Sequence, residues 1–265
     1  MSTPAFAFTD SMTMLRRQLR HMQRYVSLTV MLVAMPIVFL LLFAFVFGGT
    51  MGAGLSEASG GRADYINYIV PGIIIIAIAS VAQGTAISVA MDMTEGIIAR
   101  FRTMAIFRPS VLTGHVLGAM MQTALSLVVA IGVALAIGFR PTAGFLEWIA
   151  VAGFLAMVTL AMTWLCVALG LRAKSVETAS NIPMPLLILP FLSSGFVPTD
   201  TMPAALRWFA EYQPFTPIIE TLRGLLMGTP IGSSAAVALA WCVGITAVCF
   251  QSARRAYDRD PVPAE

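Results

Sequence analysis

Residues 69–90 read IVPGIIIIAIASVAQGTAISVA and carry no charged side chain. The hydrocarbon core of a bilayer is about 30 Å thick, and about 20 apolar residues in helical form cross it. A helix is required because lipid cannot hydrogen-bond the backbone N–H and C=O groups. The segment is therefore predicted to be a transmembrane helix. Five further segments share this character and are predicted to span as well: Val26–Gly48, His115–Gly138, Leu146–Leu171, Ala179–Phe196 and Ser233–Phe250.

The composition predicts the same class of protein. Hydrophobic residues make up 58% of the 265-residue chain and charged residues 11%, which leaves no room for a separate soluble catalytic domain. We therefore expect an all-α polytopic membrane protein with one six-helix transmembrane domain over residues 26–251, a cytoplasmic segment over 1–25 and a tail over 252–265. No charged residue lies in the middle of any predicted span, which argues against ion-coupled transport.

The basic residues predict the orientation of the chain. By the positive-inside rule, cytoplasmic connections carry the excess of Lys and Arg. One set of connections holds most of them: Arg16, Arg17, Arg20, Arg24, Arg100, Arg102, Arg108, Arg172, Lys174, Arg254, Arg255 and Arg259. The other set holds only Arg62, Arg140, Arg207 and Arg223. Both termini are thus expected in the cytoplasm of a multi-pass plasma-membrane protein, and this distribution does not suit nucleic-acid binding.

The segment Asp10–Tyr25 is predicted to be an interfacial helix. Met12, Leu15, Leu19 and Met22 recur on one helical stripe, and the arginines lie on the other side, where they can meet anionic membrane lipids. Two interpretations remain open for it. It is either a simple topology anchor or an elbow that leans on the first span and transmits movement.

The cytoplasmic connection Met91–Thr113 has an unusual number of apolar residues. Ile97, Ile98, Phe101 and Met104 form a short helical stripe, and a helix there would end before Pro109. Such a loop is predicted to be a docking surface for a cytoplasmic partner. The alternative is a segment that lies on the membrane.

The fifth predicted span and the stretch after it are irregular. Pro183, Pro185 and Pro190 remove backbone donors from this span, so it is expected to face the protein interior rather than lipid. Two helical patterns follow, Pro203–Tyr212 and Pro217–Met227, and both are too apolar for a solvated loop. An external re-entrant or interfacial helical hairpin between spans five and six is predicted. Its structural pair would be Glu220 and Arg223, three residues apart on one helix.

Several chemistries are excluded by the residues present. The only lysine, Lys174, follows Ala173, so the chain has no GxxxxGK loop for nucleotide phosphates. Ser193 and Ser194 are expected near the opposite membrane face from His115, which makes a serine–histidine dyad improbable. There is no HExxH and no CxxC, and Cys166, Cys242 and Cys249 fall inside predicted spans. The chain is therefore predicted to be non-catalytic, with no metal and no cofactor of its own.

Two runs of sequence resemble a known family. EGIIARFRTMAIFRPSVLTG at 95–114 and FLSSGFVPTDTMPAALRWFAEYQPFTPIIETLRGLLMG at 191–228 are similar to permease subunits of ABC-2 type exporters, in particular the daunorubicin-resistance type of drug and lipid exporters. The resemblance implies two permease chains, as a homodimer or a homologous heterodimer, with cytoplasmic ATP-binding subunits that hold ATP and Mg²⁺. It also implies that a coupling helix docks on the ATPase and that the hairpin caps the exit. The docking residues would be Glu95, Ile97, Ile98, Phe101, Arg102, Met104 and Arg108.

An amphipathic drug-like or lipid-like cargo suits the predicted lining of such a transporter. Gln83, Gln122 and Ser126 lie inside predicted spans, where they either line the substrate path or hydrogen-bond between helices. Phe196, Phe209 and Phe215 are predicted to form the exit gate. The alternative function is a stand-alone secondary transporter or channel, which the missing intramembrane charges and the lack of a visible internal repeat disfavour.

Overall fold

The computed structural model describes residues 12–13, 16, 26–53, 61–96 and 109–258. Within these ranges every regular element is a helix, which confirms the all-α prediction. Five helices are long and apolar enough to cross a membrane: Val30–Gly52, Arg62–Thr94, Val111–Ile137, Phe145–Gly170 and Ser234–Ala256. They match five of the predicted spans.

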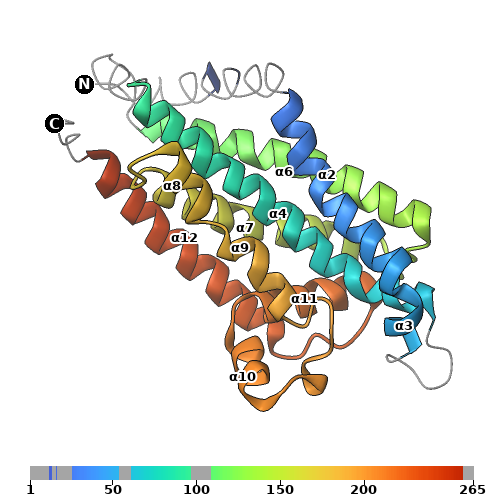
Figure 1. Cartoon of the computed structure of the whole chain (residues 1–265). Helices are drawn as coiled ribbons and strands as arrows, with labels where there is room; N and C mark the ends of the chain where they lie inside the picture. Colours follow the sequence, from blue (N-terminus) through green and yellow to red (C-terminus); the bar gives the residue numbers. More distant parts are fainter. Residues whose placement is uncertain (1–11, 14–15, 17–25, 54–60, 97–108, 259–265) are drawn as a thin grey trace.

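The long helices form a bundle (Figure 1). One apolar stretch of it, Val176–Leu192, is interrupted and is called the broken segment below. The first crossing combines α2 (Val26–Leu42), the π-helix η1 (Phe43–Phe47) and α3 (Gly48–Ala53), and the next long helices are α4 (Arg62–Thr94), α6 (Pro109–Ile137) and α7 (Phe145–Gly170). The later elements are α8 (Val176–Asn181), α9 (Pro185–Ile188), η2 (Leu189–Leu192), η3 (Thr199–Thr201), α10 (Ala204–Tyr212), α11 (Phe215–Met227) and α12 (Ser234–Asp258). The last helix thus continues beyond residue 251, the predicted end of the membrane domain.

The predicted fifth span is not a continuous helix. Its apolar stretch, Val176–Leu192, consists of α8, a turn at residues 182–184, and α9, which passes directly into the 3-10 helix η2. Proline lacks an N–H and its ring clashes with the preceding turn, so the helix breaks where prolines follow one another closely. The segment nevertheless runs alongside α4, from the end near α8 to the end near α11 (Figure 1).

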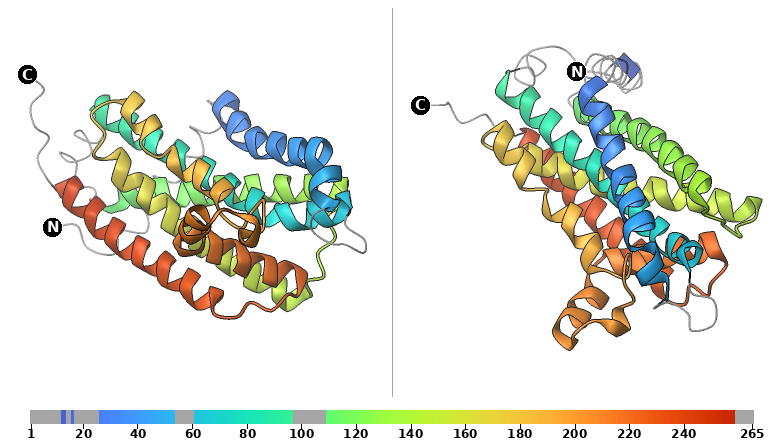
Figure 2. Two further views of the ribbon diagram at one scale, coloured as in Figure 1. Left: turned by 60° about the horizontal axis from the view of Figure 1, so that its bottom comes forward. Right: turned by 45° about the vertical axis from the view of Figure 1, so that its right-hand side comes forward.

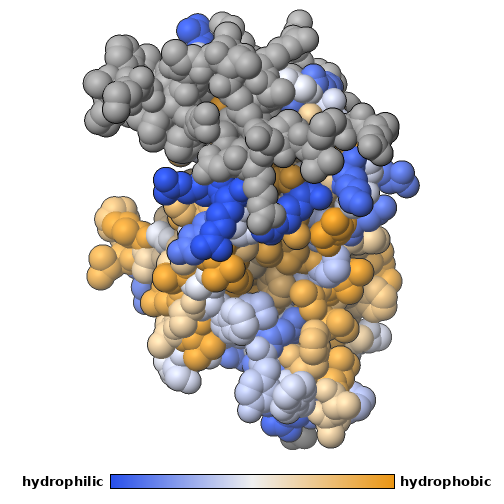
Figure 3. Space-filling view, turned by 90° about the vertical axis from the view of Figure 1, so that its left-hand side faces the viewer, coloured by the Kyte–Doolittle hydropathy of each residue, from blue (hydrophilic) through white to orange (hydrophobic). Residues whose placement is uncertain are grey.

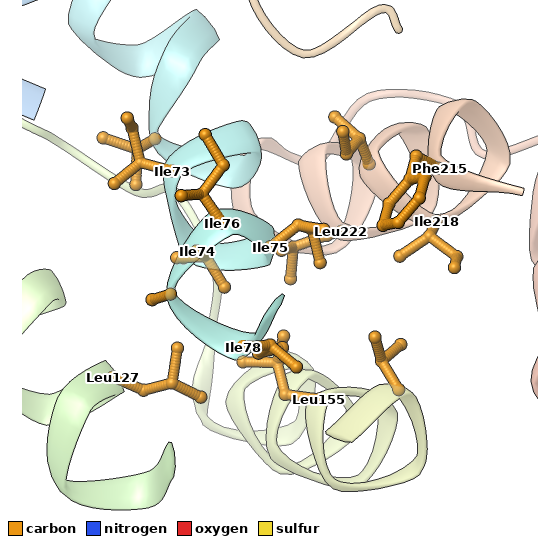
Figure 4. Packing of buried hydrophobic residues seen from close by; sticks show 14 of the residues in the cluster. Ile73, Ile74, Ile75, Ile76, Ile78, Leu127, Leu155, Phe215, Ile218 and Leu222 are labelled. Atoms are coloured by element: carbon orange, nitrogen blue, oxygen red, sulfur yellow. The ribbon is translucent and has the colours of Figure 1, made fainter. Parts of the chain in front are cut away.

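Helix α4 forms the centre of the bundle. In its most apolar stretch, 83% of the residues are buried, against 17% in the first crossing and 11% in α12. In Figure 4, the isoleucines of α4 lie between α11, which contributes Phe215, Ile218 and Leu222, and the helices α6 and α7, which contribute Leu127 and Leu155. A helix that is apolar on every side is expected at such a position. The outer helices expose valine and leucine side chains that suit lipid or a partner chain.

Helices α4 and α7 approach each other closely at Gly170. A Cβ built on Gly170 would lie 2.6 Å from the carbonyl oxygen of Ala86, so only glycine fits there without a shift of the backbone. Further along α7, a Cβ on Gly153 would meet nothing within 4 Å. Small residues commonly permit this kind of close packing between membrane helices.

The two helices predicted after the broken segment are present. α11 is buried, with Ile218, Ile219, Leu222 and Leu226 at 0% exposure, and it packs on α4, α7 and α12. It ends at Gly228, whose φ of 68° is a left-handed conformation that favours glycine. α10 projects from the bundle, as the right-hand view of Figure 2 shows, and exposes Trp208 and Tyr212.

The predicted interfacial helix Asp10–Tyr25 and most of the predicted docking segment lie outside the described residues. Of the first segment, Met12, Thr13 and Arg16 are helical and exposed. Of the second, Glu95 follows the end of α4 and is exposed.

Candidate functional site

The broken segment loses a backbone hydrogen bond at its first proline, and a glutamine of α4 replaces it. The Ser180 carbonyl has no helical donor, because Pro183 lacks an N–H and the Met184 N–H donates to Asn181 instead. Gln83 Nε2 donates to this carbonyl oxygen over 2.8 Å. Gln83, predicted to line the path or to join helices, therefore joins α4 to α8 in this conformation.

Side chains from α4, from α11 and from the connection before α11 satisfy the carbonyls where the broken segment ends. Gln213, between α10 and α11, donates through Nε2 to the Leu192 carbonyl oxygen at 2.6 Å. The Ser194 carbonyl oxygen accepts two bonds, from Tyr68 Oη of α4 at 2.9 Å and from Arg223 Nη2 of α11 at 2.6 Å. Irregular backbone is tolerated at membrane depth only where protein or a water-filled cavity satisfies it. These contacts tie the end of the broken segment to α4, to α11 and to the connection between α10 and α11.

Arg223 and Glu220 have separate partners. The Arg223 guanidinium lies 4.0 Å from the centre of the Tyr68 ring and also donates through Nη2 to the Tyr68 carbonyl oxygen at 3.3 Å. Glu220 instead accepts a hydrogen bond from Ser234 Oγ of α12 at 2.8 Å. The predicted pair thus does not form a direct ion pair; each side chain joins α11 to a different element.

Four phenylalanines form an aromatic cluster between the first crossing and the broken segment. Phe191 stacks on Phe196 with ring centres 4.6 Å apart, and Phe43 lies 4.8 Å from Phe196. Phe39 meets Phe191 edge-on at 5.3 Å. Phe43 opens the π-helix η1, a local widening that often occurs at functional positions. Of the predicted gate residues, Phe196 lies in this cluster.

The remaining predicted path residues are dispersed. Phe215 is only 1% exposed and belongs to the main core, whereas Phe209 is 40% exposed on α10. On α6, Gln122 is half-buried with no hydrogen bond to the described residues, and the Ser126 hydroxyl is buried without a partner. Of the three predicted gate residues, Phe196 and Phe215 are therefore buried in the same core cluster, and Phe209 alone lies at the surface.

A buried polar contact lies beside the predicted docking segment. His115 Nε2 of α6 is 3.1 Å from Asp92 Oδ2 of α4, and both residues are buried. These residues flank the connection 93–114, so the contact ties the two ends of that connection together. No group of three or more His, Cys, Asp or Glu residues that could hold a metal ion occurs in the part of the chain that the structure describes.

The end of the molecule that carries α10 also has an exposed ion-pair cluster. Arg207 of α10 lies 2.7 Å from Glu211 and 3.1 Å from Asp200. The hydrogen bond and negative charge of Glu211, together with the charge of Asp200, raise the pKa of Arg207. All three side chains are at the surface, so the cluster stabilises α10 only weakly.

Comparison with known proteins identifies the family. Residues 9–227 match the family model described as ABC-2 type transporter. The chain belongs to the ABC-2 type transporter family. As a member with five apolar helices of spanning length, it is a multi-pass membrane protein.

Two curated relatives of this ABC-2 type transporter are named as drug-resistance permeases. It is 28% identical over 195 residues to the daunorubicin resistance ABC transporter permease protein DrrB1 of Streptomyces coeruleorubidus, which covers 73% of this chain and 69% of the relative. It is also 28% identical over 184 residues to the probable doxorubicin resistance ABC transporter permease protein DrrC of Mycobacterium tuberculosis (strain CDC 1551 / Oshkosh). That match covers 68% of this chain and 66% of the relative.

The contacts of this ABC-2 type transporter include several that the sequence did not indicate. Tyr68, Asp92 and Gln213 were not predicted as site residues, yet each joins two elements. Tyr68 and Gln213 bond carbonyls more than 20 positions away along the chain. A partial signal existed for them, because the prolines of the broken segment predicted that neighbouring groups would satisfy its free carbonyls.

Proposed function

We propose that this chain is the permease subunit of an ATP-driven ABC exporter that moves an amphipathic drug-like or lipid-like molecule outward. Membership of the ABC-2 type transporter family carries the proposal. The two relatives named as drug-resistance permeases support export as the direction. Since the sequence contains no nucleotide-binding loop, ATP and Mg²⁺ belong to a separate ATP-binding subunit.

The ATP-binding subunit docks at residues 95–108 in this proposal. The segment has an apolar stripe, and it follows directly on α4, the central helix of the bundle. The Asp92–His115 contact joins the two helices that flank this segment, so a displacement of the segment by the ATP-binding subunit moves α4 and α6 together. Packed helices of this kind transmit movement because they repack between discrete arrangements.

Six crossings with both ends in the cytoplasm complete the proposed topology, and the broken segment is the fifth. The start of α2, the end of α4 and the end of α12 lie at one end of the molecule, whereas α3 and α10 lie at the other (Figure 1). Arg172, Lys174 and Arg254 belong to the first end, and Figure 3 shows a band of hydrophilic side chains across that side. α10 and α11 then form the external hairpin.

The cargo path in this proposal runs along the interface between two permease chains and past the broken segment. Its walls are isoleucine, leucine and phenylalanine with a few hydroxyl and amide groups, a lining that suits an amphipathic molecule. The aromatic cluster of Phe39, Phe43, Phe191 and Phe196 closes the outer part, and an unpartnered Ser126 hydroxyl offers a polar contact.

A transport assay in cells tests the function. Drug-sensitive cells are transformed with this chain together with a candidate ATP-binding subunit, either intact or with its Walker A lysine replaced. Export of a fluorescent anthracycline that requires both intact subunits would support the proposal. Equal export with the inactive ATP-binding subunit would contradict it.

Cysteine labelling tests the topology separately. Single cysteines at Ser56 and Thr199 should react with an impermeant thiol reagent in intact cells, and one at Ser175 should not. The native cysteines Cys166, Cys242 and Cys249 are buried and should give little background. Labelling at Ser175 would refute the six-crossing arrangement.

A further inference from the structure

Arg223 is a membrane-domain cation without a contacting carboxylate. It donates to the carbonyl oxygens of Tyr68 and Ser194, and its charge also interacts with the Tyr68 phenol and with Glu220. Glu220, the nearest acidic residue along the chain, accepts from Ser234. Arg207 provides the contrast on the neighbouring helix, since two carboxylates pair with it at the surface. Charges inside a membrane protein usually pair or mark a functional position.

Polar atoms around Arg223 lack partners. Arg223 Nε, Ser194 Oγ and Gln213 Oε1 are all buried and make no hydrogen bond. Ser194 and Gln213 are only 4% and 6% exposed. Arg223 Nη1 also makes no hydrogen bond to a described residue but is not fully sealed. Buried polar atoms nearly always make hydrogen bonds. Several unpaired ones around one short stretch therefore indicate a binding site for a ligand.

Free donors belong to two residues that are in contact. Arg223 Nη2 bonds the Ser194 carbonyl at 2.6 Å, which brings the guanidinium next to the residue whose hydroxyl is free. Two donor groups of this kind, one of them cationic, match an oxygen anion such as a carboxylate or a phosphate. A neutral amide or sugar hydroxyl would leave the guanidinium without a carboxylate or phosphate in contact, since Glu220 acts on its charge but does not pair with it.

We propose that Arg223 and the Ser194 hydroxyl form a binding site for one anionic group of an amphipathic molecule. The inference rests on the proposed function, because it places the site beside the outer part of the cargo path. The Tyr68 ring over the guanidinium and Ile219 against Gly195 supply apolar walls for the rest of the molecule. In this proposal the anionic group first contacts Arg223 Nη1. The sealed Arg223 Nε and Ser194 hydroxyl bind it when α10 and α11 move away from the broken segment.

Binding to the purified full-length chain tests the site without ATP or a transport partner. In dodecyl maltoside, native mass spectrometry measures retention of dodecyl phosphate and dodecanoate, with dodecanol as the neutral probe of equal chain length. We expect the anions to bind about tenfold more tightly than dodecanol, a factor that one charge-assisted hydrogen bond supports. Arg223→Gln should abolish this preference. Arg207→Gln, which removes the same charge from an exposed position, should retain it.

A second variant guards against a folding defect in Arg223→Gln. Ser194→Ala removes an oxygen that has no partner in this structure, so the fold should be kept while anion binding weakens at least threefold. Unchanged anion preference in both Arg223→Gln and Ser194→Ala would overturn the proposal. So would equal binding of the three probes by the wild type.

Two sources of the anion are distinguished by adding phospholipids to the same assay. Arg223-dependent retention of phosphatidylglycerol over phosphatidylcholine would identify a lipid headgroup as the ligand. Arg223-dependent retention of the single-chain anions alone would identify a smaller amphipathic cargo. Either result supports the site, and neither depends on whether the chain exports drugs.

Discussion

Replacing Gln83 by leucine tests whether this residue joins helices or touches cargo. The change removes the donor that satisfies the Ser180 carbonyl at 2.8 Å, and no helical N–H is available to replace it. Loss of a hydrogen bond that leaves a buried partner unsatisfied costs about 1–3 kcal/mol, although interhelical bonds in membranes average about 0.6 kcal/mol. We therefore expect about 1 kcal/mol of destabilisation.

The assay is thermal unfolding of the purified chain in detergent. About 1 kcal/mol corresponds to a fall of roughly 2–4 °C in the melting midpoint for a chain of this size. Gln122→Leu is the matched control, because Gln122 is half-buried and makes no hydrogen bond to a described residue. A stable Gln83→Leu protein with a changed export profile would refute the helix-joining role.

Three further predictions concern packing and the docking end. Gly170→Ala should lower the melting midpoint by several degrees, because its Cβ would lie 2.6 Å from a backbone oxygen. Gly153→Ala, whose Cβ would meet nothing within 4 Å, should not lower it. Equal midpoints of the two variants would contradict the close α4–α7 approach. His115→Phe removes the imidazole that contacts Asp92 at 3.1 Å and should lower the melting midpoint in the same assay. An unchanged midpoint would show that this contact does not stabilise the fold. Phe101→Ala should weaken co-purification with the ATP-binding subunit about thirtyfold, and unchanged binding would remove that residue from the interface.

Length and lack of charge were sufficient to predict five of the membrane helices. The central position of α4 was not predicted, because its most apolar stretch is less hydrophobic than that of the first crossing and only the packing shows which of them is buried. The fifth span was apolar over the required length as well, but its prolines break the helix into α8, α9 and η2. Apolar length therefore predicts membrane location better than it predicts continuous helical geometry.

The partners of polar side chains could not be predicted from spacing alone. Three-residue spacing favoured a Glu220–Arg223 pair, yet packing of α11 places the guanidinium against Tyr68 and Ser194. Ser180 and Gln83 are 97 positions apart, and no local pattern connects them. Phe215 had the character of a gate residue, but the packing of α11 on α4 buries it in the core.

The central claim is that this chain transports by using ATP bound to another subunit. The most direct measurement is the ATPase activity of the complex co-purified with the tagged chain and reconstituted in vesicles, with and without an amphipathic drug. We predict that an ATP-binding subunit co-purifies and that the drug stimulates hydrolysis together with ATP-dependent drug uptake into inside-out vesicles. A chain that purifies alone, and whose transport in vesicles follows an ion gradient without ATP, would contradict the account.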